Sequence, residues 1–91
     1  MTQNKNKQQW LRLYRLLERL MQDERNFVSS SEIAWLYNRW YPDYAVDKLS
    51  VFENLKFFKK LGLVDQAKWH GHTESKWRLK RNATPNNLVI R

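Results

Sequence analysis

The chain has 91 residues, the size of one small domain, and it contains no cysteine. A fold held by disulfides and a zinc site built on thiolates are therefore excluded. Its 17 Lys and Arg residues against nine Asp and Glu give a net charge of +8, and aromatic residues make up 14% of the chain. This balance favours a polyanionic partner.

The sequence also predicts the cellular compartment of the protein. No apolar run is long enough to span a membrane, and the polar segment 1–9 lacks the apolar core of an export signal. We therefore expect a soluble protein of the cytoplasm with no membrane partner. The excess positive charge lies in the first and last thirds of the chain, while the middle third is nearly balanced.

The first predicted helix covers residues 7–23, after an arm, 1–6, that is expected to be flexible. Apolar side chains recur there at three- and four-residue steps, which predicts one buried face made of Trp10, Leu13, Leu17, Leu20 and Met21. The opposite side is expected to be a solvated basic face, with direct contact to nucleic acid as the alternative. Its residues are Arg12, Arg15 and Arg19.

A very short strand at residues 27–28 and a second helix at 31–40 are predicted next. Ser29 and Glu32 have the spacing of a capping box, and Pro42 ends the helix because proline disfavours helical backbone at the residue before it. The helix is expected to bury Ile33, Leu36, Tyr37 and Trp40.

A third helix is predicted from a cap at Asp47 to about Leu61, with Gly62 as its left-handed C-terminal cap. Its inner stripe consists of Val51, Leu55 and Phe58. From residue 63 the period becomes two, which predicts an antiparallel hairpin with strands near 63–69 and 76–80. Trp77 and Leu79 are expected on the inner face of the hairpin, and residues 82–91 are expected to form a mobile tail.

Three short helices followed by a basic hairpin are the element order of a winged helix-turn-helix. We therefore predict a mainly α fold with a small β hairpin, in which residues 7–81 form one winged-helix domain between the arm and the tail. Three helices would enclose an aromatic-rich core, and the hairpin would close it.

One segment also resembles a known family. Residues 50–55 read Ser-Val-Phe-Glu-Asn-Leu; Pro42-Asp43 precede them and Gly62-Leu63-Val64 follow. This resembles the DNA-binding domain of the ferric-uptake-regulator family, in which a Pro-Asp segment is followed by Thr-Val-Tyr-Arg-Asn-Leu and then Gly-Leu-Val. The resemblance covers roughly residues 29–80 and implies a winged helix whose third helix recognises DNA.

Two departures limit what the resemblance implies. The family's Tyr and Arg, which face DNA, are replaced by Phe52 and Glu53. The chain also ends before the second domain that carries the family's metal sites and dimer contacts, so metal-dependent repression is not carried over.

The leading hypothesis is a small stand-alone protein that binds double-stranded DNA, a transcriptional regulator of a size that suits a phage, virus or plasmid. Four residues of the third helix would lie nearest the bases, and lysines of that helix and basic residues of the wing would neutralise phosphates. A solvated strand face is the other explanation of the basic hairpin. The candidate residues are Ser50, Phe52, Glu53, Asn54, Lys56, Lys60, Lys68, Lys76, Arg78, Lys80 and Arg81.

The main alternative is a winged helix that binds a protein, within a larger complex or on transcription machinery. A winged helix that binds RNA is a third hypothesis. Glu53 and the apolar groups beside it suit a protein interface as well as they suit DNA. A homodimer, joined through the first helix or the tail, is also open. The candidate interface residues are Trp35, Trp69, Leu88, Val89 and Ile90.

Enzymatic and metal chemistry have little support in the sequence. The chain has no glycine-rich phosphate loop and no nucleophile motif. His70 and His72 are close together, but no further ligand stands at a suitable spacing. We therefore expect no catalytic site, no metal and no cofactor.

Overall fold

The computed structural model describes residues 2–22, 27–67 and 75–81. Their elements, in chain order, are α1 (Thr2–Gln22), β1 (Val28–Ser29), α2 (Ser30–Trp40), the 3-10 turn η1 (Pro42–Tyr44), α3 (Lys48–Lys60), β2 (Val64–Ala67) and β3 (Lys76–Leu79). The predicted fold class is confirmed: the fold is mainly helical, with a small antiparallel sheet placed as in a winged helix. None of the helices in the described ranges is long and apolar enough to cross a membrane.

The sheet has three strands in the order β1-β3-β2, and both pairings are antiparallel. Val64 pairs with Leu79 and Ala67 with Lys76, which is the predicted hairpin. Val28 pairs with Trp77, so the short strand before α2 extends the hairpin on its other edge. The short strand was expected one residue earlier, at 27–28, and its pairing with β3 was not expected.

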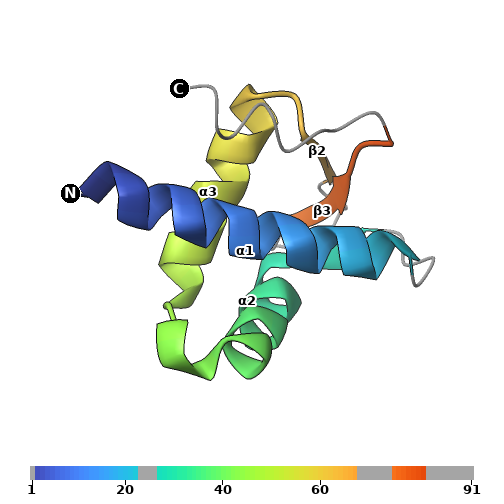
Figure 1. Cartoon of the computed structure of the whole chain (residues 1–91). Helices are drawn as coiled ribbons and strands as arrows, with labels where there is room; N and C mark the ends of the chain where they lie inside the picture. The colour runs from blue at the N-terminus through green and yellow to red at the C-terminus, as the bar shows by residue number, and fades with distance from the viewer. Residues whose placement is uncertain (1, 23–26, 68–74, 82–91) are drawn as a thin grey trace.

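The helix α1 crosses in front of α2 and α3, and the sheet lies beside them (Figure 1). The core between these elements includes Leu13, Leu17, Ile33, Leu55 and Phe58, each less than 4% exposed. Trp77 is fully buried, and its indole Nε1 donates a hydrogen bond of 2.8 Å to the Ser30 hydroxyl. This buried bond ties β3 to the first residue of α2, as a buried indole N–H requires.

The helix α1 begins at Thr2, five residues before the predicted start, so residues 2–6 belong to the helix and not to a separate arm. The prediction that Arg12 lies on a solvated face is wrong. Its Nε donates a hydrogen bond of 2.9 Å to the Tyr37 hydroxyl, and its guanidinium lies 4.2 Å from the centre of the Tyr44 ring. Arg12 therefore joins α1 to α2 and η1.

The beginning of α2 confirms the predicted cap, because the Ser29 hydroxyl accepts a hydrogen bond of 3.2 Å from the Glu32 backbone N–H. Its end differs from the prediction, since Trp40 is 43% exposed and not part of the core. Trp40 is the last residue of the helix, and its ring lies 6.3 Å from that of Tyr41. A periodic pattern identifies a face but not how far the neighbouring elements cover it.

The helix α3 has both predicted caps. The Asp47 carboxylate accepts a hydrogen bond of 2.8 Å from the Ser50 backbone N–H, and its hydrogen bonds with Ser50 lower the pKa of Asp47. At the other end Gly62 has a φ of 77°, its N–H bonds the Lys59 carbonyl, and the Leu63 N–H bonds the Phe58 carbonyl. These two bonds form a Schellman motif, which ends the helix and turns the chain into β2.

Candidate nucleic-acid interface

An open groove of about 570 Å³ lies between the C-terminal half of α3 and strand β2. We call it the lysine groove. It contains three cationic side chains and no carboxylate among the residues that line it, which are Phe52, Lys56, Lys59, Lys60 and Gln66. A site of this composition attracts anions.

The helical period explains why the lysines gather there. Val51, Leu55 and Phe58 are fully buried, so the 100° step per residue turns Lys56, Lys59 and Lys60 towards the sheet and the solvent. The Schellman motif then brings β2 back along this side of α3. The groove is thus a consequence of the same cap that ends the helix.

Phe52 forms the aromatic wall of the groove. Its ring meets the buried Trp77 ring edge-on at 5.9 Å, and the Lys56 ammonium lies 5.3 Å from the centre of the Phe52 ring. The sequence analysis expected Phe52 among the residues nearest the bases. It is half-buried instead, and it supports the lysines.

Gln66 connects the groove to the sheet. Its Oε1 accepts a hydrogen bond of 2.8 Å from the Lys59 ammonium, and its Nε2 donates one of 2.7 Å to the Ser75 hydroxyl. Lys59 and Gln66 were not among the predicted site residues. Lys59 stands in the last turn of α3, where a lysine is also explained by the helix dipole, and the strand register that places Gln66 beside it depends on contacts along the whole sheet.

Asn54 does not lie where the prediction placed it. Its Oδ1 accepts a hydrogen bond of 3.1 Å from the Trp10 indole N–H, so the side chain faces α1 and is half-buried. Trp10 also stacks on Phe57 with a ring distance of 4.5 Å. The flank of α3 that carries these two residues is therefore packed against α1, and Asn54 is not placed to contact bases. Ser50 on the same flank is half-buried, and its backbone N–H donates the hydrogen bond to the Asp47 carboxylate that caps the helix.

Glu53 is exposed on the outer face of α3, as predicted, and it lies 3.7 Å from the Lys56 ammonium. This contact joins residues one helical turn apart, and both side chains are more than half exposed. It therefore contributes little stability, and water or an anion competes readily for Lys56.

The basic strand β3 alternates as predicted: Trp77 and Leu79 point into the core, while Arg78 is exposed. The Asp65 carboxylate forms ion pairs with two cations: it lies 3.6 Å from Arg78 in this strand and 3.7 Å from Lys80, the residue after it. Arg78 also lies over the Phe27 ring at 4.6 Å. The positive field of this strand is therefore weaker than its number of basic residues suggests.

The remaining predicted positions divide into two sets. Arg81 is exposed at the end of β3, and Lys76 is half-buried in the same strand. The rest lie outside the described residues: Lys68, Trp69, Leu88, Val89 and Ile90, and the histidines His70 and His72. Within the part of the chain that the structure describes, no group of three or more His, Cys, Asp or Glu residues is placed to hold a metal ion.

Comparison with known proteins adds no assignment. No family model matches the sequence, and searches of curated proteins and of solved structures find no match. Any proposal about function therefore depends on the chemistry of the described surfaces.

Proposed function

We propose that this protein binds double-stranded DNA through its winged helix, as a small regulator of transcription. The observation that carries the proposal is the lysine groove, where three ammonium groups gather beside the outer face of α3 without a lining carboxylate. In three-helix variants of the helix-turn-helix the third helix enters the major groove, and contacts of other residues with phosphates fix its position. An intracellular location would follow from this role.

The basic residues proposed to contact DNA are expected to differ in how strongly they bind phosphates. Lys56, Lys59 and Lys60 are suited to the phosphate backbone, whereas Arg78 and Lys80 share the charge of Asp65. Glu53 on the outer face of α3 opposes phosphates but accepts a hydrogen bond from a cytosine amino group. The groove thus supplies affinity, and the face that carries Glu53 supplies any sequence preference.

A salt series with a labelled random-sequence DNA duplex tests the proposal by fluorescence anisotropy. If the three lysines of the groove each neutralise one phosphate, the logarithm of the binding constant should fall with the logarithm of salt concentration with a slope of about −3 or steeper. Weak binding without a salt slope would contradict the proposal. Tighter binding to an RNA duplex of the same sequence would assign the surface to RNA.

A matched pair of variants locates the contact. Lys60→Glu reverses an exposed charge in the groove, and Arg15→Glu reverses an exposed charge on α1 that does not line it. We expect Lys60→Glu to weaken binding about tenfold and to reduce the salt slope by at least about 1, and Arg15→Glu to do neither. Equal losses in the two variants would show attraction by net charge alone and would exclude the groove as the site.

A further inference from the structure

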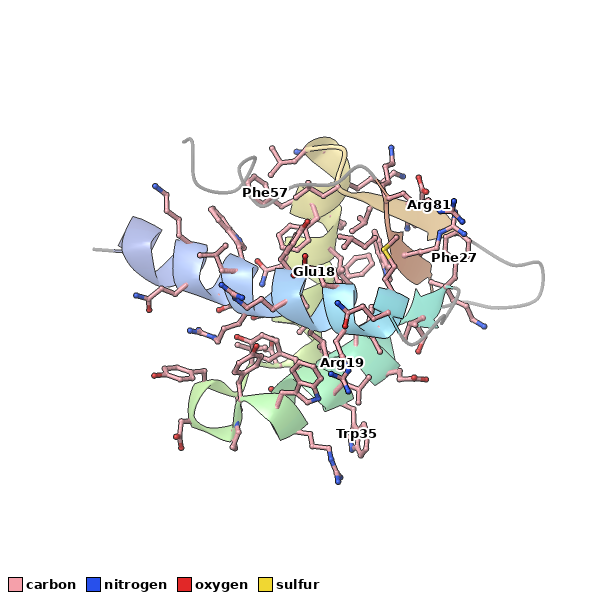
Figure 2. All side chains as sticks on the ribbon, turned by 45° about the vertical axis from the view of Figure 1, so that its right-hand side comes forward. Glu18, Arg19, Phe27, Trp35, Phe57 and Arg81 are labelled. Carbon is pink, nitrogen blue, oxygen red and sulfur yellow. The ribbon has the colours of Figure 1, made fainter. Side chains whose placement is uncertain are left out.

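One ammonium group of the lysine groove is held by a side chain of the sheet. The C-terminal end of α3 and the strand β2 lie next to each other on one side of α1 (Figure 2). The Lys59 ammonium donates a hydrogen bond of 2.8 Å to the Gln66 Oε1, and the Gln66 Nε2 donates one of 2.7 Å to the Ser75 hydroxyl. A lysine of the helix, a glutamine of β2 and a serine just before β3 thus form one hydrogen-bonded chain.

The orientation of the Gln66 amide is fixed from both ends. An ammonium group only donates hydrogen bonds, so the amide turns its oxygen to Lys59 and its nitrogen to Ser75. Ser75 is 7% exposed, and its carbonyl accepts a hydrogen bond of 3.4 Å from the Ser30 N–H. Gln66 itself pairs with Trp77 in the sheet. The amide oxygen that faces Lys59 is therefore supported by residues of the core.

The partner of Lys59 carries no charge, unlike the partner of the neighbouring cation. Lys56 lies 3.7 Å from the Glu53 carboxylate, which offsets part of its positive charge. An amide oxygen holds an ammonium in place without offsetting its charge. An ammonium has three donors, and the hydrogen bond to Gln66 uses one, so two remain for the oxygens of a phosphate. Lys59 is thus held in place and keeps its full charge.

We infer that Gln66 is a positioning residue, which holds the Lys59 ammonium in the lysine groove for contact with a phosphate of the DNA backbone. This role rests on the proposed binding of DNA. Ordering a lysine side chain on binding costs affinity, and a contact already made in the free protein removes part of that cost. Gln66 therefore increases the affinity through Lys59.

Two substitutions at Gln66 separate position from charge, measured by anisotropy with the random-sequence duplex. Gln66→Met keeps the length of the side chain but offers the ammonium only a weak acceptor. It should weaken binding about threefold and leave the salt slope unchanged, because all three lysines keep their charge. Gln66→Glu keeps an acceptor but adds a carboxylate beside Lys59. It should weaken binding at least about tenfold and reduce the salt slope by about 1.

A double-mutant cycle distinguishes positioning from support of the sheet. Lys59→Met alone removes the phosphate contact and should reduce the salt slope by about 1. In the Lys59→Met background, Gln66→Met should leave the binding constant unchanged, because no ammonium remains to be held. If Gln66 only supported the sheet, Gln66→Met would weaken binding about threefold in both backgrounds. Circular dichroism checks that every variant keeps its helices.

The position of Lys59 is also measured without DNA, by NMR of the ammonium groups in the ¹⁵N-labelled full chain. A hydrogen-bonded ammonium exchanges its protons with water more slowly than a solvated one. In the wild type we expect slower exchange at Lys59 than at the exposed Lys60. In Gln66→Met the two lysines should exchange at similar rates.

The possible failures are distinguishable. A wild type that binds no duplex would overturn the proposed function and the role of Gln66 with it. A wild type that binds DNA with the expected salt slope, while Gln66→Met binds equally tightly or loses the same factor in both backgrounds, would overturn the role of Gln66 alone. Exchange at Lys59 as fast as at Lys60 in the wild type would also overturn that role alone.

Discussion

The lysine groove lies on α3 and β2, whereas the exposed rings of Trp35, Trp40 and Tyr44 lie on α2 and η1. The groove has three cations around one half-buried ring. The three rings of α2 and η1 are 60%, 43% and 56% exposed. The two regions thus present different side chains to solvent: ammonium groups on one and aromatic rings on the other.

The supports of the two surfaces also differ. A buried tryptophan and a Schellman motif lie beneath the groove, whereas hydrogen bonds and cation–π contacts at the edge of the core hold α2 and η1, which carry the exposed rings. Substitutions in these supports should therefore affect the two surfaces unequally. Four predictions follow from this difference, in order of decreasing effect.

The largest effect is expected for Trp77→Ala. This substitution removes a fully buried ring, its contact with Phe52 and the hydrogen bond to Ser30, and it should lower the free energy of unfolding by about 3–5 kcal/mol. Both surfaces would be lost where the domain unfolds. Trp77→Phe is the control, since it keeps most of the volume and should lose about 1–3 kcal/mol by leaving the Ser30 hydroxyl without its donor. Urea denaturation measures both values, and equal losses would show that packing of the ring is not the main support.

Asn38→Ala should act on the side of α2 and η1. The Asn38 amide donates to the Val46 carbonyl and accepts from the Val46 N–H, each at 2.8 Å, and so holds the connector between α2 and α3. Its removal should cost about 1–2 kcal/mol of unfolding free energy. Hydrogen exchange should show faster exchange in residues 41–47 with little change in β2 and β3. An increase of the same size in the strands would mean that the two sides are not independent.

Arg12→Lys should have a smaller effect on the same side. Lysine keeps the charge but loses the planar guanidinium that bonds Tyr37 and stacks on Tyr44, and the expected cost is about 0.5–1 kcal/mol. Arg15→Lys is the matched control on an exposed position of the same helix and should have no measurable effect. Thermal denaturation compares the two, and equal melting temperatures would contradict a role for Arg12 as a link between α1 and η1.

The smallest effect concerns Asp47, the cap at the start of α3. Its folded-state pKa is lowered by hydrogen bonds with Ser50, so the carboxylate stabilises the fold above its unfolded pKa of about 3.9, and this contribution is lost as the pH falls through the lower folded pKa. Asn keeps a cap without the charge. Wild type and Asp47→Asn should therefore differ slightly in stability at neutral pH and converge below about pH 4. A difference that does not change with pH would contradict a contribution from the charge.

The features that the sequence predicted correctly are the local ones. The caps at Ser29, Asp47 and Gly62 involve residues three to five positions apart, and the buried stripe of α3 follows from the helical period. The three helices and the hairpin were therefore predictable from patterns within short windows.

The features that it did not predict depend on distant neighbours. Val28 pairs with Trp77, and Asn54 accepts from Trp10, across separations that no local pattern reports. Arg12 belongs to a charged row on its own helix, yet it contacts tyrosines of other elements. Part of the candidate site was missed for the same reason, because Gln66 reaches Lys59 through the register of the sheet.

The order of strands has a consequence for how this protein is made. The strand β3 lies between β1 and β2 although it is the last of the three in sequence. During synthesis on the ribosome, β1 and the three helices leave the exit tunnel before β3. The strand β1 therefore cannot pair with β3 until residue 79 has emerged. Completion of the sheet, and with it the burial of Trp77 against Ser30, therefore has to wait for the synthesis of β3 and cannot proceed strand by strand along the growing chain.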